Sequence, residues 1–276
     1  MMDNRMPDRT AYRAEGEGEP IVFIHGVGMN KDVWAPQLDA FAATHRVVLY
    51  DMLGHGGSPL PPAKPTLADY AGQLRRLLDA LGIDRANIVG HSMGSLVALA
   101  FALAHPERVL RLVALNAVYD RTPEQRAAVE ARAALLAEEG MGATLDGTLE
   151  RWFGKAEEPT LAEKARQVRA WLEAVDPVGY ARTYRLFASS DDAFVGRLDR
   201  LAMPALFLTG EHDRNSSPEM SRRMAAVAPN GVAQVVAGER HMMSFTSPET
   251  VNPILRDFLS TPLPPAGRAE GASART

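Results

Sequence analysis

"ANIVGHSMGSLVALAFALAHP", residues 86–106, runs from a short apolar segment into a helical pattern through the turn Gly-His-Ser-Met-Gly. Glycine on both sides of a turn permits close backbone approach and a strained central residue, because Gly has no Cβ. The stretch therefore predicts a strand, a sharp turn and a helix, with the side chain of Ser92 pushed into the open. A G-x-S-x-G pattern arises by chance in about one chain in ten of this composition, so its meaning depends on the rest of the chain.

Apolar runs like the one before Ser92 recur along the chain and predict the strands of one sheet. They lie at residues 21–25, 45–51, 86–90, 109–116, 204–210 and 232–238. Helical patterns separate several of them, at residues 66–82, 95–106 and 217–229. Continuous apolar strands that alternate with helices are typical of a parallel sheet covered on both faces. The sequence thus predicts an α/β fold with a mostly parallel, doubly wound sheet.

The alternation of strands and helices stops between residues 119 and 195, where the chain contains helical patterns only. Thr122, Thr160 and Asp176 stand where helix N-caps are expected. We therefore predict an inserted all-helical cap over residues 119–195, between two parts of a core at residues 1–118 and 196–260. Residues 261–276 are small, polar and rich in Pro and Gly, which predicts a disordered tail.

The amino-acid composition excludes several kinds of chemistry and several classes of partner. The 276 residues include no cysteine, which excludes disulfides, thiolate catalysis and cysteine-ligated metals. The net charge is -4 and the Lys and Arg residues are scattered, so no basic stripe for nucleic acid or an anionic membrane is expected. No secretory signal pattern or membrane-spanning apolar run is present in the sequence, so a cytoplasmic protein with a small-molecule partner is expected. A homodimer is left open.

Three polar residues follow three different predicted strands. Ser92 follows residues 86–90, Asp213 follows residues 204–210, and His241 follows residues 232–238. In an open parallel sheet, ligands bind at the carboxyl ends of the strands. A serine hydroxyl needs an adjacent base, and the base needs an acceptor that fixes its tautomer. These three residues supply all the parts, although Glu211 and Asp120 remain alternatives for the acid.

The motifs "IHGVG", "YDMLGHGGS", "GHSMG", "LTGEHD" and "ERHMMSFTSPE" resemble, in order and spacing, those of the α/β-hydrolase superfamily over about residues 10 to 260. The resemblance implies Ser92 as the nucleophile, His241 as the base and Asp213 as the acid. It also implies an oxyanion hole from the backbone amides of Val27 and Met93. No metal or other cofactor is required by such a mechanism, and "GVGMNK" and "EHD" do not have the spacing of a phosphate loop or a zinc site.

Within the superfamily, the chain looks most similar to 3-oxoadipate enol-lactonases and small carboxylesterases. We expect a serine hydrolase that cleaves an ester, lactone or related acyl bond of a small organic acid through an acyl-enzyme. Ring-cleavage carbon–carbon hydrolases usually carry Asn before the serine and Trp after the histidine, whereas this chain has His91 and Met242. A carbon–carbon hydrolase, a cofactor-free perhydrolase or lyase, and a ligand receptor with a vestigial triad stay open as alternatives.

Substrate contacts are the least defined part of the prediction. The residues named as candidates for the substrate pocket are Trp34, Trp152, Tyr184 and Met242. If the substrate carries a carboxylate, position in the sequence makes Arg182, Arg185 and Arg240 the candidate cations.

Overall fold

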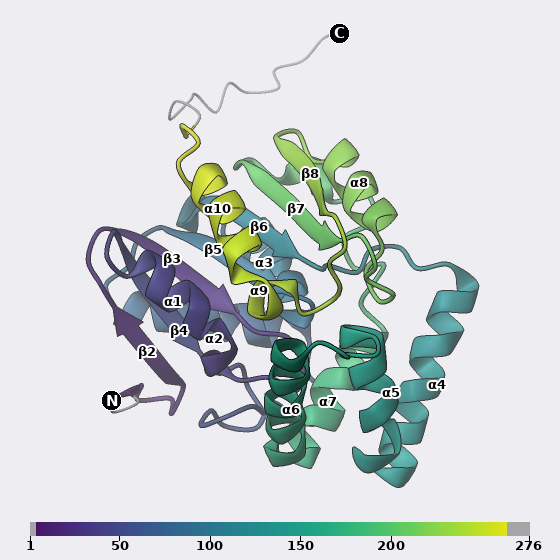
Figure 1. Cartoon of the computed structure of the whole chain (residues 1–276). Coiled ribbons are helices and arrows are strands. Elements are labelled where there is room, and N and C mark those ends of the chain that lie inside the picture. Colours follow the sequence, from purple (N-terminus) through teal and green to yellow (C-terminus); the bar gives the residue numbers. More distant parts are fainter. Residues whose placement is uncertain (1–3, 264–276) are drawn as a thin grey trace, which may run out of the picture.

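An eight-stranded sheet forms the centre of the protein (Figure 1), in the order β1-β2-β4-β3-β5-β6-β7-β8. The computed structural model describes residues 4–263, so residues 264–276 of the predicted tail lie outside the described residues. The strands are β1 (Asn4–Arg5), β2 (Ala11–Glu15), β3 (Glu19–Ile24), β4 (His45–Tyr50), β5 (Ala86–His91), β6 (Val109–Leu115), β7 (Ala205–Gly210) and β8 (Gly231–Val236). The pairs β1·β2 and β2·β4 are antiparallel, and all the other pairs are parallel. The predicted mostly parallel sheet is confirmed.

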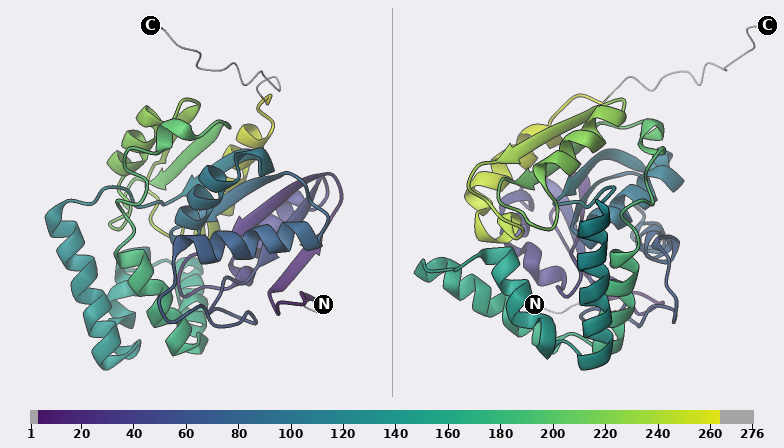
Figure 2. Two further views of the ribbon diagram at one scale, coloured as in Figure 1. Left: turned by 180° about the vertical axis from the view of Figure 1, so that it is seen from behind. Right: turned by 90° about the vertical axis from the view of Figure 1, so that its right-hand side faces the viewer.

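Helices cover both faces of this sheet (Figure 2). The helices that connect or flank the strands are α1 (Ala35–Phe41), α2 (Leu67–Ala80), α3 (Met93–Ala104), α8 (Pro218–Val227), α9 (Met243–Thr246) and α10 (Pro248–Leu259). Helix α1 packs with α10, whereas α2 packs with α3 on the opposite face. The chain passes from β3 through α1 to β4 on one side of β3, and then from β4 through α2 to β5 on the other side of β3. Because both crossovers are right-handed, α1 and α2 lie on opposite faces of the sheet.

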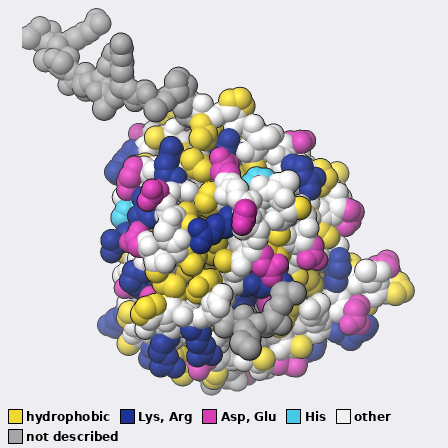
Figure 3. Space-filling view, turned by 90° about the vertical axis from the view of Figure 1, so that its left-hand side faces the viewer, with side chains coloured by type: hydrophobic (Ala, Val, Ile, Leu, Met, Phe, Trp, Pro, Cys, Tyr) yellow, Lys and Arg dark blue, Asp and Glu magenta, His cyan; other side chains and the backbone are white. Residues whose placement is uncertain are grey.

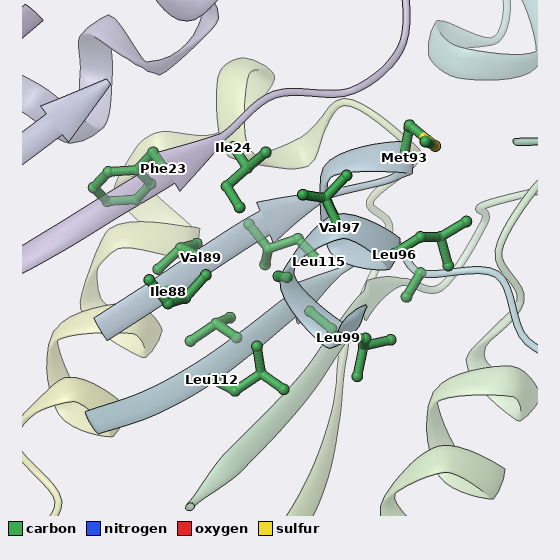
Figure 4. Close-up of a cluster of buried hydrophobic side chains, with 14 of the residues drawn as sticks. Phe23, Ile24, Ile88, Val89, Met93, Leu96, Val97, Leu99, Leu112 and Leu115 are labelled. Atoms are coloured by element: carbon green, nitrogen blue, oxygen red, sulfur yellow. The ribbon is translucent and has the colours of Figure 1, made fainter. Parts of the chain in front are cut away.

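The core lies where α3 packs on β5 and β6 (Figure 4). Every residue of β5 and β6 is buried, because these central strands are covered on both faces. Leu96, Val97 and Leu99 extend from α3 toward the sheet and are fully buried. Since α3 begins directly after Ser92, this packing fixes the position of the strand-to-helix turn relative to the sheet.

Four helices stand between β6 and β7 in the chain and lie together at one end of the sheet (Figures 1 and 2). They are α4 (Pro123–Glu139), α5 (Gly142–Phe153), α6 (Pro159–Ala174) and α7 (Pro177–Ala188). Thr122 and Asp176 cap α4 and α7 as predicted. The predicted cap Thr160 is wrong: Glu158 accepts hydrogen bonds from the amides of Thr160 and Leu161. The helix begins earlier because Pro159, which lacks an N–H, suits its first position.

The chain enters and leaves these four helices at one place. The amide of Asp120 donates a hydrogen bond to the carbonyl of Asp191 (2.7 Å). The fully buried carboxylate of Asp191 accepts from the amide of Arg121 (2.9 Å) and pairs with its guanidinium (3.1 Å). On the core side, Arg223 of α8 donates to the carboxylate of Asp120 (2.8 Å). The base of the four-helix segment is thus tied to the sheet domain.

The surface carries charges of both signs. On the face drawn in Figure 3, acidic and basic side chains are interspersed around small apolar areas. Over residues 4–263, no helix is both long and apolar enough to cross a membrane.

Candidate active site

Ser92 occupies the sharp turn between β5 and α3. Its backbone angles, φ 54° and ψ -116°, are in the left-handed half of the map, which is rare for a residue with a side chain. Its amide donates to the carbonyl of Leu115 at the end of β6 (2.9 Å). Strain of this kind persists only where the surrounding structure holds it, and it is concentrated at functional sites.

The two glycines of the turn serve close packing rather than unusual backbone angles. A Cβ on Gly90 would lie 2.2 Å from the carbonyl oxygen of Gly94, and a Cβ on Gly94 would lie 2.2 Å from that of Ile24. Both distances are far shorter than van der Waals contact, so α3 can approach β3 and β5 only with glycine here. Ser95, the residue after this turn, donates its hydroxyl to the carbonyls of Gly90 and Leu115 at 2.7 Å.

His241 and Asp213 meet at the same end of the sheet. Nδ1 of His241 donates to Oδ2 of Asp213 at 2.8 Å, and both side chains are buried. Burial alone raises the pKa of Asp213, but His241, the Asn116 amide and the Asn215 backbone amide together lower it below its ordinary value. Because Nδ1 carries the proton toward Asp213, Nε2 of His241 remains free to accept one. Within the described residues, no hydrogen bond joins the Ser92 hydroxyl to the ring of His241.

The two other carboxylates considered for the acid lie elsewhere. Asp120 pairs with Arg223 at 2.8 Å, and Glu211 accepts a hydrogen bond from the amide of Gly238. Of the three carboxylates named from the sequence, only Asp213 contacts His241.

His91 lies beside His241 and supports it. Nε2 of His91 donates to the backbone carbonyl of His241 at 2.8 Å, and the two ring centroids are 4.8 Å apart. Burial and the neighbouring His241 ring lower the pKa of His91 to about 3. His91 is therefore neutral at physiological pH and holds the loop that carries His241.

The loop after β3 lies against the Ser92 turn. A Cβ on Gly26 would be 3.3 Å from Cβ of Ser92, so the loop passes beside the serine just before it reaches Val27. Among residues 4–263, the amide of Val27 has no hydrogen-bond acceptor, whereas the amide of Gly28 donates to Nε2 of His55 (3.0 Å). Met93 is the first residue of α3, where backbone amides have no partner inside the helix. Within residues 4–263, the amides of Val27 and Met93 are thus donors without a backbone or side-chain acceptor, one in the loop against the Ser92 turn and one directly after Ser92.

The four inserted helices close over these residues. The indole of Trp152 in α5 stacks on the imidazole of His241, with ring centroids 5.4 Å apart. Leu172 of α6 and Tyr180 of α7 press on Gly28, because a Cβ there would lie 2.5 and 2.8 Å from them. Ser92 is only 3% exposed and His241 only 1%. The site is enclosed by apolar and aromatic walls.

The other predicted pocket residues occupy different surroundings. Trp34 is fully buried between Phe23 and His91, at ring distances of 5.0 and 6.4 Å. Met242 is buried directly before α9, next in sequence to His241. Tyr184 stacks on Tyr180, with centroids 5.7 Å apart. Trp152 and Tyr184 therefore belong to the inserted helices, whereas Trp34 and Met242 belong to the core.

Two arginines that the sequence analysis did not name lie with these tyrosines. Nε of Arg132 in α4 donates to the hydroxyl of Tyr184 (3.3 Å), and Arg151 in α5 donates to the hydroxyl of Thr148 (2.8 Å). Within residues 4–263, neither forms an ion pair, and Nε of Arg151 is buried with no partner. Burial and the nearby Arg132 guanidinium lower the pKa of Arg151. Two guanidinium groups thus share a partly buried space in which neither forms an ion pair among residues 4–263, although the charge of Glu150 acts favourably on Arg151.

The three arginines named from the sequence lie outside this cluster. Arg182 donates to the carbonyl of Pro61 (2.7 Å), and with Arg185 it lines an outer groove of about 730 Å³. Arg240 packs against Gly154, where a Cβ would be 2.9 Å from its Nε. No pattern in the sequence distinguishes Arg132 and Arg151 from other helical arginines, because their proximity depends on how α4, α5 and α7 pack.

Known proteins resemble this chain over most of its length. Residues 19–248 match the alpha/beta hydrolase fold family. A hydrolase of (E)-2-((N-methylformamido)methylene)succinate from Acinetobacter baylyi is 40% identical over 92% of this chain and 95% of its own. The enol-lactonase of Burkholderia xenovorans is 28% identical, with a TM-score of 0.83 over 91% of this chain and 97% of that one. A malate-bound esterase of Thermogutta terrifontis is 25% identical, with a TM-score of 0.82 over 93% and 96%.

Proposed function

The chain belongs to the α/β-hydrolase family, and from this premise we propose that it cleaves an acyl bond of a small carboxylate-bearing substrate by a Ser92–His241–Asp213 triad. The observation that carries the proposal is the 2.8 Å hydrogen bond between His241 and Asp213, at the same end of the sheet as the strained Ser92 turn. In the absence of substrate, catalytic hydrogen bonds are often long, so the missing Ser92–His241 bond is compatible with this role.

In the proposed reaction, Nε2 of His241 takes the proton of the Ser92 hydroxyl as the oxygen attacks the substrate carbonyl. Asp213 stabilises the imidazolium that forms and holds the ring in its tautomer. The carbonyl oxygen becomes negatively charged and accepts hydrogen bonds from the amides of Val27 and Met93. The imidazolium then protonates the leaving group, and a water molecule activated by His241 releases the acid from Ser92.

The inserted helices act as a cap that selects the substrate. Trp152, Leu172 and Tyr180 exclude water from the reacting carbonyl, which strengthens each electrostatic contact in the site. Arg132 and Arg151 lie in this cap without an ion pair among residues 4–263, and a guanidinium binds a carboxylate through paired hydrogen bonds. We propose that these two arginines bind the carboxylates of the substrate.

The related proteins favour the same chemistry. The name of the Acinetobacter relative specifies a succinate, a dicarboxylate, that carries a formamide, and the Thermogutta esterase holds malate, another dicarboxylate. Applied to this chain, these names favour a dicarboxylate whose scissile group is an amide or an ester. An enol-lactone is the next candidate, because the Burkholderia relative is an enol-lactonase.

The test combines a chemical probe with small substrates. A fluorophosphonate should label Ser92, as located by peptide mass spectrometry, and Ser92→Ala should lose both the label and about 10⁴-fold or more of kcat. The substrate panel is N-formylaspartate, O-acetylmalate and p-nitrophenyl acetate, with products identified by mass.

The outcomes separate the alternatives. Full activity of Ser92→Ala would contradict the nucleophile, and an unlabelled, inactive wild type would indicate a receptor with the same fold. Cleavage of a carbon–carbon bond, or transfer to peroxide in place of water, would move the protein to those reaction classes.

A further inference from the structure

Asn116 stands between the two strands that carry the nucleophile and the acid. It directly follows β6, which pairs with β5 on one side and β7 on the other. Its amide donates to the carbonyl of Leu208 in β7 (2.8 Å), and its own carbonyl accepts the hydroxyl of Ser216 (2.6 Å). The residue is fully buried and its φ is 52°. Asn tolerates this left-handed conformation better than most residues with a side chain.

The side chain of Asn116 contacts the same carboxylate oxygen as the base. Nδ2 of Asn116 and Nδ1 of His241 both donate to Oδ2 of Asp213, each at 2.8 Å. The other oxygen, Oδ1, accepts the backbone amides of Asn215 (2.7 Å) and Ser216 (3.2 Å). All four donors together fix the plane of the carboxylate.

In this orientation, the side-chain amide of Asn116 leaves its own oxygen without a hydrogen bond. Oδ1 of Asn116 is buried and has no hydrogen-bond partner in the described part of the chain. Turning the amide over would give Oδ1 no better partner, because it would then face the Asp213 carboxylate, another acceptor. A buried polar atom without a partner is uncommon in native proteins. Here it is explained by the other end of the same amide, because Nδ2 can donate to Asp213 only in this orientation.

We propose that Asn116 is a positioning residue that holds Oδ2 of Asp213 on Nδ1 of His241. The inference rests on the proposed triad and adds a residue to it. Without Nδ2, one of the two donors on Oδ2 is lost, the carboxylate is held less firmly about its Cβ–Cγ bond by the three donors that remain, and the imidazole loses part of its alignment toward Ser92. The amide also stabilises the ionised form of Asp213, which must stay negative to stabilise the imidazolium.

Asn116→Leu removes the donor and also the orphan oxygen, but leucine tolerates a φ of 52° less well than asparagine, so the kinetics of this variant are measured below its own unfolding midpoint, where it is folded. We expect kcat to fall about 10- to 100-fold with KM unchanged, the range for losing a hydrogen bond to a charged group. Gln37→Leu is the matched control, because it removes an equally buried side-chain amide, with hydrogen bonds to the Ser244 carbonyl and Asn252 and an orphan oxygen of its own, away from the carboxylate. This control should keep its kcat.

The variant Asn116→Asp supplies a second measurement, the pH dependence of kcat/KM, which a purely structural role of Asn116 would not change. It sets a second carboxylate beside Asp213, and two such groups share one proton with a raised pKa. The ratio of Asn116→Asp to wild-type kcat/KM should therefore rise as the pH falls from 8 to 6, because the shared proton restores a donor.

Wild-type kcat in Asn116→Leu, or an equal loss in Gln37→Leu, would overturn the inference and leave the triad standing. An active Ser92→Ala would instead overturn the triad itself.

Discussion

The indole of Trp152 stacks on the imidazole of His241, with ring centroids 5.4 Å apart and ring planes inclined by 28°. One ring belongs to helix α5 of the inserted segment and the other to a loop of the core. The contact therefore links the inserted helices to the residue proposed as the base. Ser92 is only 3% exposed, so if it is the nucleophile we expect α5 or a neighbouring helix to move when a substrate enters.

Trp152→Ala should lower kcat/KM about tenfold, because the imidazolium formed during the reaction loses an aromatic face worth about 1–2 kcal/mol. Trp152→Phe should lie between Ala and wild type. The control is Trp171→Ala in α6, which removes an aromatic contact with Phe245 instead. Equal kinetics in Trp152→Ala and wild type would show that the stack has no part in catalysis.

Arg132→Gln and Arg151→Gln should each raise KM about tenfold or more for substrates with a carboxylate, since each loses a charge-assisted hydrogen bond. p-Nitrophenyl hemisuccinate and p-nitrophenyl acetate form a matched anionic and neutral pair for steady-state kinetics. Only the anionic ester should be affected. Arg185→Gln, in the outer groove, is the control. A parallel loss on both esters would assign the arginines to the stability of the cap.

Gly94→Ala should destabilise the protein by about 3 kcal/mol and abolish activity, because its Cβ would lie 2.2 Å from the backbone oxygen of Ile24. Gly72→Ala is the matched change in α2, where the Cβ would meet only the end of the Arg76 side chain, at 3.4 Å. That variant should gain about 0.5–1 kcal/mol through helix propensity. Urea denaturation of both measures the difference, and equal stabilities would contradict the packing argument.

The stability of the protein should fall as the pH drops below about 6.5. Burial lowers the pKa of His55 to about 3 and that of His25 to about 4, from an ordinary value of 6.5. In this window the unfolded chain binds protons that the folded protein does not, so the free energy of unfolding decreases with decreasing pH. His55→Gln should make this dependence shallower in urea denaturation between pH 7 and pH 5. Identical slopes in the variant and wild type would be the contrary result.

Local patterns were enough to predict most of the fold and to bring the candidate site residues to one edge of the sheet. The strands of the parallel sheet are continuous apolar runs, and each is followed by a turn whose polar residue must lie at the same edge of the sheet. Ser92, Asp213 and His241 could be placed together for this reason, and the structure brings Asp213 and His241 within 2.8 Å.

Features that depend on how helices pack could not be predicted in the same way. Arg132 and Arg151 look like other helical arginines until α4, α5 and α7 turn them toward the tyrosines. Asn116 could be seen as the end of a strand, but its donor role depends on the approach of a loop about 100 positions later. The predicted cap at Thr160 failed because the helix begins two residues earlier, where Glu158 accepts the amides of Thr160 and Leu161.

The contacts of Asp191 have a consequence for how such a protein can change. Asp120 and Asp191 are hydrogen-bonded to each other, so the chain between them leaves the sheet and returns to it at the same point, as a closed loop does. The entropy of closing a loop grows only with the logarithm of its length. Helices can therefore be lengthened, shortened or exchanged beyond that base at little thermodynamic cost, while the spacing of β6 and β7 stays the same. The polar residues at the strand ends of the sheet can thus keep their places while the helical segment between β6 and β7 changes.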